Sequence, residues 1–250
     1  MEADPVGGSA ILAGWFQGAR DHDMGLLDVA FAAEPVGEVL DRVAIGIGDT
    51  VRFVPGARSH LQARELRGLW QPLAEALAGL DATGQDVIVD AGRLGMAESP
   101  QALLERADLT LLVTRTDLPA MAATRSHADL VARTSPWRRS GLLVVGSGRP
   151  YSASGAAKYL GLPLAGSIPL QPKDAAVYHQ GATPRPRFHK GAFARSLHTT
   201  AHALRAQVAI ATPSAAPTTE PEAVPGRGQV GVAGPASVWA AAADRRREQS

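Results

Sequence analysis

Residues 86–90 form the apolar run Asp-Val-Ile-Val-Asp, and the small-residue turn Ala91–Gly92–Arg93 follows directly. A short run rich in Val and Ile is typical of a strand that is buried on both faces of a parallel sheet. In open α/β sheets, ligands bind beyond the carboxyl ends of the strands, where Asp90 would lie. The sequence therefore predicts a strand at residues 86–90 and makes Asp90 a candidate site residue. Alternatively, Asp90 has only a structural role at the end of this strand.

Strand-like runs alternate with helical patterns along the rest of the chain. Further strands are predicted at residues 51–55, 109–113, 142–145 and 164–168. Helices are predicted at residues 61–80, 100–106, 118–133, 154–160, 174–179 and 192–208. Such alternation with short connections favours a mostly parallel sheet with helices on both faces. We therefore expect one α/β domain over residues 1–209.

The composition changes from residue 210 onward. Pro213–Pro235 consists mostly of Pro, Ala, Thr, Gly and Ser, with almost no large apolar residues. Such a segment cannot bury enough surface to offset the entropy lost on ordering. We predict a disordered tail over residues 210–250. Near its end, Trp239 and Arg245–Arg247 are either solvated or a short docking motif.

Overall composition limits the classes of protein. The formal charge is +1, which gives no strong case for bulk attraction to nucleic acid or membrane. The absence of Cys excludes disulfides and thiolate metal sites, and suits a reducing cytoplasm. No apolar run approaches the roughly 20 residues that span a bilayer. We expect a cytoplasmic protein without a transmembrane segment.

Three further segments accompany the predicted strand at residues 86–90 in a fixed order. They are residues 2–8 (Glu-Ala-Asp-Pro-Val-Gly-Gly), residues 106–120 and residues 160–176. In this order and rough spacing, residues 1–205 resemble the MinD/ParA family of deviant P-loop ATPases. The nearest branch is that of the actinobacterial MinD-like proteins that occur beside pilus or secretion machinery.

The resemblance implies an acidic half of a nucleotide site. Asp4 matches the acid in the loop that senses the γ-phosphate and the metal, and Asp90 matches the Walker B acid. Together they would bind Mg²⁺ and organise the attacking water. Gly92 and Arg93 lie in the adjoining switch-like turn.

The resemblance also implies a base-binding half. Relatives often place an Asn that reads the base where this chain has Gly146–Ser147, so recognition by that route is in doubt. Pro169, Gln171 and Pro172 match the late loop that packs over the nucleobase. Relatives often carry Asp at the position of Gln171.

The phosphate-binding loop of the family has no counterpart in these residues. Family members begin with a strand and a Gly-rich loop with two lysines, which cradle phosphate. The pattern G-x-x-x-x-G-K-[ST] and the dipeptide Gly-Lys are both absent from the 250 residues. ATP and Mg²⁺ are therefore expected only if the missing loop is supplied. Three explanations of the missing loop remain open. The true protein starts upstream and carries the loop, or the chain is a degenerate paralogue whose sheet has closed up, or a separate chain supplies the missing strand.

The resemblance implies a protein that positions a chromosome, a division septum or a pilus or secretion complex. It would act as a homodimer or with an intact homologue, peripheral to the membrane or nucleoid. ATPase activity of this chain is doubtful without the P-loop. The alternative is a non-catalytic scaffold or interaction protein derived from the family.

Other chemistry-bearing side chains have simpler interpretations. His198 and His202 lie four residues apart, but no Glu completes an H-E-x-x-H pattern, so we expect surface histidines. A solvated face is favoured over DNA contact for the basic residues Arg185, Arg187, Lys190 and Arg195. We expect core or boundary positions for Trp15, Trp70 and Trp137. The sequence contains no G-x-S-x-G motif, which argues against a serine hydrolase of that class.

Overall fold

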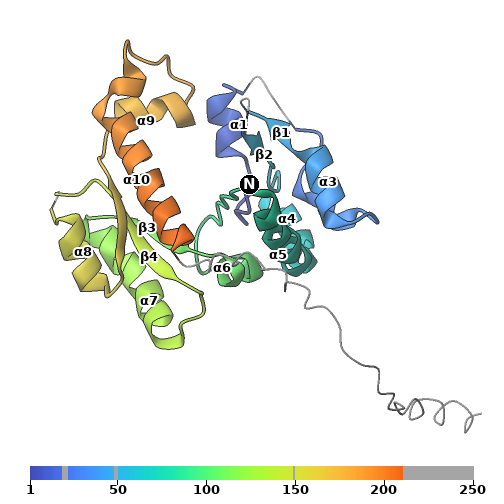
Figure 1. Cartoon of the computed structure of the whole chain (residues 1–250), viewed down its shortest axis with the longest axis horizontal. Helices are drawn as coiled ribbons and strands as arrows, with labels where there is room; N and C mark the ends of the chain where they lie inside the picture. The colour runs from blue at the N-terminus through green and yellow to red at the C-terminus, as the bar shows by residue number, and fades with distance from the viewer. Residues whose placement is uncertain (19–21, 48–49, 149, 211–250) are drawn as a thin grey trace, which may run out of the picture. The chain divides into compact units, whose positions relative to one another are not determined.

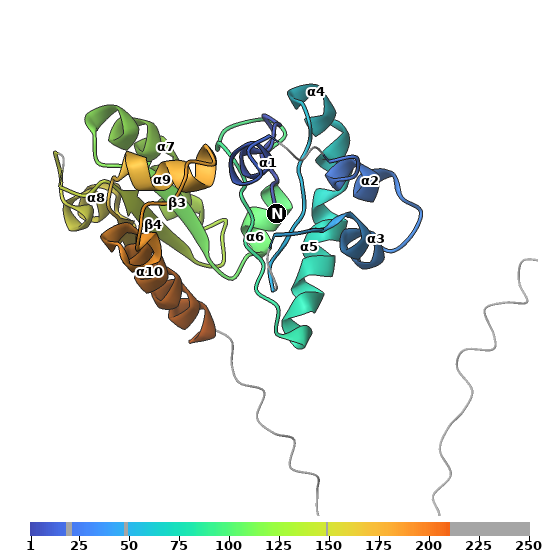
Figure 2. The same cartoon turned by 90° about the horizontal axis from the view of Figure 1, so that it is seen from above.

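A computed structural model of the chain describes residues 1–18, 22–47, 50–148 and 150–210 (Figures 1 and 2). The helices are α1 (Ala10–Trp15), α2 (Leu26–Phe31), α3 (Val36–Val43), α4 (His60–Ala63), α5 (Trp70–Ala78), α6 (Gln101–Arg106), α7 (Leu118–Thr134), α8 (Ala153–Leu160), α9 (Pro172–His179) and α10 (Ala192–Ala209). The 3₁₀ helices are η1 (Glu65–Gly68), η2 (Gly79–Thr83) and η3 (Phe188–Lys190). The strands are β1 (Ile45–Gly46), β2 (Arg52–Phe53), β3 (Thr110–Arg115), β4 (Ser140–Val145) and β5 (Leu164–Ile168).

Strands β3, β4 and β5 form a parallel sheet in that order. Thr110 of β3 lies opposite Ser140 of β4, and Leu143 of β4 lies opposite Gly166 of β5. Helices α7 and α8 connect these strands in sequence. The predicted α/β fold with a parallel sheet is confirmed, with strand ends displaced by up to two residues.

Helices cover this sheet on two faces. Leu112, Leu142 and Val144 point to one face and are buried against α7 and α8. On the other face, α10 packs over β5, where Thr200 contacts Gly166. Figure 2 shows α7 and α10 on opposite faces of the sheet. The carboxyl ends of β3, β4 and β5 lead into the loops that precede α7, α8 and α9.

A second core lies in the amino-terminal half. Strands β1 and β2 pair antiparallel. Beside them, the Glu2 amide donates to the Val54 carbonyl at 3.1 Å. Helices α2, α3 and α5 bury apolar side chains that include Leu26, Val39 and Leu73. This core holds residues 1–4 and the loop at Asp90 in place.

The predicted strand at residues 86–90 is wrong as a full strand. Only Asp90 forms a parallel bridge, with Glu2, and Ile88 is 83% exposed. The Asp90 amide donates to the Met1 carbonyl at 2.9 Å, and the Ala3 amide donates to the Asp90 carbonyl at 2.7 Å. Residues 86–89 thus have a strand neighbour on one side at most, which leaves this apolar run without the second neighbour that a buried strand needs.

The predicted continuous helix at residues 61–80 is also wrong. The chain forms α4, η1, α5 and η2 in succession. Pro72 has no N–H to continue a helix from the preceding turn, but it is tolerated in the first turn of a new helix. Helix α5 accordingly begins at Trp70. Helices α1, α2 and α3 were not predicted, because residues 10–43 show no long amphipathic repeat.

Two sequence predictions concern segments outside this fold. The predicted disordered tail and its Trp239 and Arg245–Arg247 lie outside the described residues, apart from Ile210. The helices of the described ranges are all too short or too polar to cross a bilayer.

Candidate functional site

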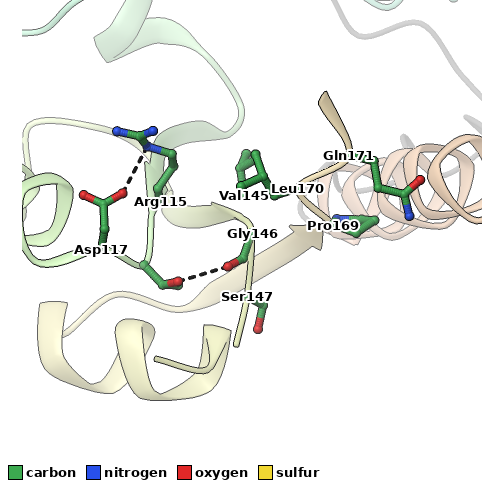
Figure 3. Close-up of a pocket in the computed structure, with 9 residues that line it drawn as sticks. Arg115, Asp117, Val145, Gly146, Ser147, Pro169, Leu170 and Gln171 are labelled. Carbon is green, nitrogen blue, oxygen red and sulfur yellow. Dashed lines mark hydrogen bonds and ion pairs between the residues drawn. The ribbon is translucent and has the colours of Figure 1, made fainter. Parts of the chain in front are cut away.

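A cavity of about 310 Å³ opens at the carboxyl ends of β3, β4 and β5 (Figure 3). Each strand end contributes to its wall. The lining residues are Arg115, Thr116, Asp117, Val145, Gly146, Ser147, Pro169, Leu170 and Gln171. The volume lies at the lower end of the range for small-molecule sites. Its place beyond the strand ends is where α/β sheets bind ligands.

Hydrogen bonds fix the wall formed by β3 and β4. Thr116 is 1% exposed, and its hydroxyl donates to the Gly146 carbonyl at 3.0 Å. The Arg115 Nε lies 3.2 Å from the Asp117 Oδ2. The Asp117 Oδ1 also accepts from the Ala120 amide at 3.0 Å, which caps α7. This wall is therefore rigid and carries both charges at its rim.

On the opposite wall, fewer polar side chains are already engaged in hydrogen bonds within the protein. The Ser147 Oγ accepts from the Ala153 amide at 2.9 Å, at the start of α8. The Gln171 side chain forms no hydrogen bond with the described residues, so both ends of its amide are available to a ligand. Gly146 has a φ of +80°, and a Cβ there would lie 3.1 Å from the Leu170 Cβ. A side chain at position 146 would crowd the cavity.

Asp4 and Asp90 come together at a separate point. Their segments pair through the bridge between Glu2 and Asp90. The Asp90 Oδ1 accepts from the Gly92 amide at 2.9 Å. The Asp4 carboxylate packs on Gly92 so closely that a Cβ at Gly92 would lie 2.3 Å from its Cγ. Both predicted acids thus flank the turn that follows Asp90.

Asp4 and Asp90 suit a metal ion that is held mainly by a bound small molecule. The Asp4 Oδ1 accepts from the Val6 amide at 2.9 Å, and the Asp90 Oδ1 is likewise engaged. Each carboxylate keeps its other oxygen. No group of three or more His, Cys, Asp or Glu residues that could hold a metal occurs in the described ranges. Mg²⁺ is typically bound through one or two carboxylates plus substrate phosphates, so these acids fit Mg²⁺ only together with a nucleotide.

The predicted site residues therefore divide into two groups. Ser147, Pro169 and Gln171 line the cavity, and Pro172 follows as the first residue of α9. The other group consists of Asp4, Asp90, Gly92 and the exposed Arg93. Ala91 and Leu94 pack against the core beneath β3 and β4, which links the second group to the sheet.

Lining residues that were not predicted as site residues include Thr116, Asp117, Arg115, Val145 and Leu170. A signal for the first two was present. Asp117 precedes Leu118–Pro119, and Asp followed by Pro in the first turn is a helix-start pattern. The residues between a predicted strand and such a start lie at the carboxyl edge of the sheet. Leu170 carries no comparable signal.

The other side chains considered from the sequence lie away from this site. His198 and His202 are exposed. Arg185 pairs with the buried Asp174, and both line a second cavity of about 520 Å³. The tryptophans mostly follow the prediction: Trp70 and Trp137 are buried, whereas Trp15 is half-exposed and stacks on Tyr178.

The amino terminus beside the acids predicts a measurable pH dependence. The Met1 ammonium donates to the Ile88 carbonyl at 2.9 Å. Burial lowers the pKa of the Met1 amino group below its usual value of 8.0, against the opposing charges of Glu2 and Asp90. Because the unfolded chain then binds this proton more tightly, the free energy of unfolding should rise as pH approaches about 8 and level off above it.

Urea denaturation at roughly pH 6.5 and pH 8.5 measures this rise. The matched control is the chain acetylated at Met1, which has no ionisable amine. The free energy of unfolding of the acetylated chain should rise less between these pH values, since all other groups titrate equally in the acetylated and the unmodified chain. An identical pH dependence of the two forms would contradict the burial of the ammonium.

No family model matches the chain. Uncharacterized proteins of Mycobacterium tuberculosis, from strains CDC 1551 and H37Rv, are 33% identical to it over 114 residues. The match covers 41% of this chain and 32% of each relative. It thus spans about a third of the length of these relatives.

Solved structures define the class of fold. The cell division ATPase MinD of Pyrococcus furiosus superposes with a TM-score of 0.64 at 18% identity, over 82% of this chain and 84% of that chain. A ParA family ATPase of Chlorobium tepidum superposes with a TM-score of 0.61 at 16% identity, over 81% and 82%. The MinC:MinD complex of Aquifex aeolicus superposes with a TM-score of 0.61 at 15% identity, over 90% of this chain and 84% of that chain. The chain has the α/β fold of the MinD/ParA P-loop ATPases.

Proposed function

We propose that the chain is a MinD/ParA-like positioning protein that binds ATP weakly and does not hydrolyse it alone. The cavity at the carboxyl ends of three parallel strands carries this proposal. The nucleobase would enter beside Gln171, and the triphosphate would extend toward Asp4 and Asp90 with Mg²⁺. Neutral hydrogen-bonding groups at the cavity and carboxylates beyond it suit the two ends of such a ligand.

Weak binding follows from the groups that are absent. Backbone N–H groups and a lysine normally supply most of the attraction for the phosphates. Neither acid has a Lys or Arg ion pair in the described ranges, so the phosphates would meet carboxylates whose charge no Lys or Arg offsets. A Kd on the order of 0.1–1 mM is expected, which corresponds to a binding free energy of about 4–5.5 kcal/mol.

Titration with a fluorescent ATP analogue in the presence of Mg²⁺ tests the proposal. Gln171→Ala removes an unpaired amide from the cavity and should weaken binding about three- to tenfold. Gln180→Ala, at the exposed end of α9, is the matched control and should leave the affinity unchanged. Failure of the folded protein to bind at near-millimolar ATP would refute the proposal.

The proposed partners are those expected for a protein of the MinD/ParA class. A homodimer or a complex with an intact homologue would carry the positioning activity, in chromosome partitioning, septum placement or pilus or secretion assembly. Its place would be the cytoplasm, at the membrane or nucleoid surface. A contact with DNA has little support, since Arg185 is already engaged by Asp174.

One observation favours a second candidate, a non-catalytic interaction protein. The 250 residues contain no Gly-Lys dipeptide and therefore no loop of the G-x-x-x-x-G-K-[ST] pattern. In that case the chain would bind partners irrespective of ATP. A pull-down of an intact MinD/ParA homologue with and without ATP separates the two candidates: only the positioning protein should respond to ATP.

A further inference from the structure

The loop between α9 and α10 gathers basic side chains around the second cavity (Figure 1). Arg185, Arg187 and Lys190 line this cavity of about 520 Å³, and Asp174 is the single acid among its described lining residues. Asp174 is 5% exposed and already forms an ion pair with Arg185. Arg187 and Lys190 therefore give the cavity an excess of positive charge, although the whole chain has a formal charge of only +1.

These two excess cations are not neutralised by the described part of the protein. The side chains of Arg187 and Lys190 are exposed and form no ion pair or hydrogen bond with the described residues. Gly191, which also lines the cavity, is the N-cap of α10, and no side chain caps this end of the helix. The partial positive charge at the start of α10 adds to that of the two side chains. The electrostatics of the cavity thus favour an anionic ligand.

The backbone at Arg187 is held in a conformation that costs free energy. Its φ is +61°, in the left-handed region that disfavours residues with a Cβ. The Phe188 amide donates to the Arg185 carbonyl at 3.0 Å, and the Lys190 amide donates to the Arg187 carbonyl at 2.8 Å. Strained residues of this kind cluster at binding sites, where the surrounding structure holds them in place. The chain therefore keeps an arginine where glycine would fit with less strain.

An aromatic surface adjoins the cavity. Phe188 is a buried lining residue, and its ring centroid lies 5.8 Å from that of Tyr178. Tyr178 stacks in turn on Trp15, with centroids 6.1 Å apart and ring planes 7° apart. Tyr178 is 37% exposed and Trp15 is 47% exposed. A ligand that extends beyond the cavity can therefore contact apolar rings as well as cations.

We infer that this cavity binds an acidic peptide segment of a partner protein, with an aromatic or aliphatic side chain beside its carboxylates. The carboxylates pair with Arg187 and Lys190, and the guanidinium group can donate two parallel hydrogen bonds to one carboxylate. The apolar side chain lies on Tyr178 and Trp15. Because hydrogen bonds already fix the loop, binding orders few further groups of the protein.

Nucleic acid and small phosphates fit these residues less well. A DNA duplex is held through many phosphate contacts, often about 6–10. The described lining offers two unpaired cations beside a buried carboxylate, which is too few for such a contact. A small phosphate would leave the rings of Tyr178 and Trp15 unused. The acidic peptide is the ligand that uses both the charges and the rings.

A fluorescein-labelled peptide, Gly-Asp-Glu-Phe-Glu-Asp-Leu-Gly, serves as the probe, with the full chain and no ATP present. We expect saturable binding in fluorescence anisotropy, with a Kd on the order of 0.1 mM. Arg187→Gly and Lys190→Ala should each weaken binding by about three- to tenfold, because each removes a charge-assisted contact. Arg133→Ala, at an exposed position in the last turn of α7, removes the same charge elsewhere and should change the affinity by less than about twofold.

Arg187→Gly also separates a binding role from a structural one. Glycine adopts a positive φ without strain, so the midpoint of urea denaturation should not fall. Weaker peptide binding by a variant whose midpoint is undiminished supports the inference. Undiminished binding by this variant overturns it.

Two peptide controls sharpen the test. Asn and Gln in place of the four acids should abolish saturable binding, because the charges that pair with Arg187 and Lys190 are lost. Ser in place of Phe and Leu should weaken binding by about three- to tenfold, because the contact with the rings is lost. In amide NMR, addition of the original peptide should shift the signals of Phe188, Lys190 and Gly191.

Further results would overturn the inference. They are a lack of saturation up to about 1 mM peptide, equal affinity of Lys190→Ala and Arg133→Ala, and signal shifts confined to other parts of the chain. Displacement of the peptide by about 1 mM inorganic phosphate, or tighter binding of a DNA duplex of about 20 base pairs, would assign the cavity to another class of ligand. Since the peptide assay contains no ATP, its failure is distinct from failure of the ATP titration.

Discussion

Replacing Leu142 by alanine is expected to lower the free energy of unfolding by about 2–5 kcal/mol. Leu142 is 0% exposed at the middle of β4, the central strand of the parallel sheet. It packs among residues of α7 and α8 on one face. Truncation removes apolar contacts and leaves a cavity that the flanking strands cannot close.

Chemical denaturation of the two proteins measures this loss. The matched control is Leu118→Ala, which truncates the same side chain at an exposed position in the first turn of α7. It should change the free energy of unfolding by less than about 0.5–1 kcal/mol. Equal losses at the two positions would show that the core beneath β4 is not packed as described.

Replacing Gly92 by alanine is expected to disrupt the acid pair. Gly92 has a φ of +67°, and its Cβ would lie 2.3 Å from the Cγ and Oδ1 of Asp4. The positive φ alone costs about 1–2 kcal/mol for a residue with a Cβ. The clash would also move the Asp4 carboxylate, which costs the hydrogen bond from the Val6 amide, about 1 kcal/mol.

Gly84→Ala separates these two effects. Gly84 has nearly the same φ, +69°, but nothing lies within 4 Å of its Cβ position. Gly92→Ala should therefore be the less stable variant by about 1–2 kcal/mol in urea denaturation. It should also be the one that weakens Mg²⁺-dependent ATP binding. Equal stability and equal ATP binding of the two variants would contradict the described contact between Asp4 and Gly92.

Much of the carboxyl-terminal half could be predicted from sequence. Strands β3 to β5 and helices α7 to α10 lie close to their predicted bounds. Each strand pairs with at least one other, and α7 and α8 bury apolar side chains against the sheet. A local cue also marked one boundary, Gly161 after α8. Here local preference and tertiary packing agree.

The amino-terminal half was harder to predict. The run at residues 86–90 has the composition of a buried strand, but composition does not reveal whether a neighbour is present on each side. Short helices such as α1 and α2 have only 6 residues each, which gives too little periodicity to detect. These elements depend on contacts between distant segments.

The candidate site was predicted in part for a similar reason. Asp90 stands at the end of a predicted strand, where chain position indicates the ligand-binding edge, whereas Ser147 and Pro169 were expected from the resemblance to the MinD/ParA family. The resemblance to the MinD/ParA family was needed for Asp4, since no predicted strand precedes it. The separation of the site into a cavity and an acid pair could not be read from sequence, because it depends on contacts between segments far apart in the chain, such as the bridge between Glu2 and Asp90.

Two-dimensional amide NMR during titration with Mg²⁺ and ATP tests whether the cavity at the carboxyl ends of β3, β4 and β5 binds the nucleotide. We expect shifts that saturate at near-millimolar ATP for the amides of Thr116, Gly146 and Gln171, with smaller shifts at Gly92. Unchanged spectra at that concentration would contradict it. So would shifts centred on Phe188 and Lys190, beside the second cavity.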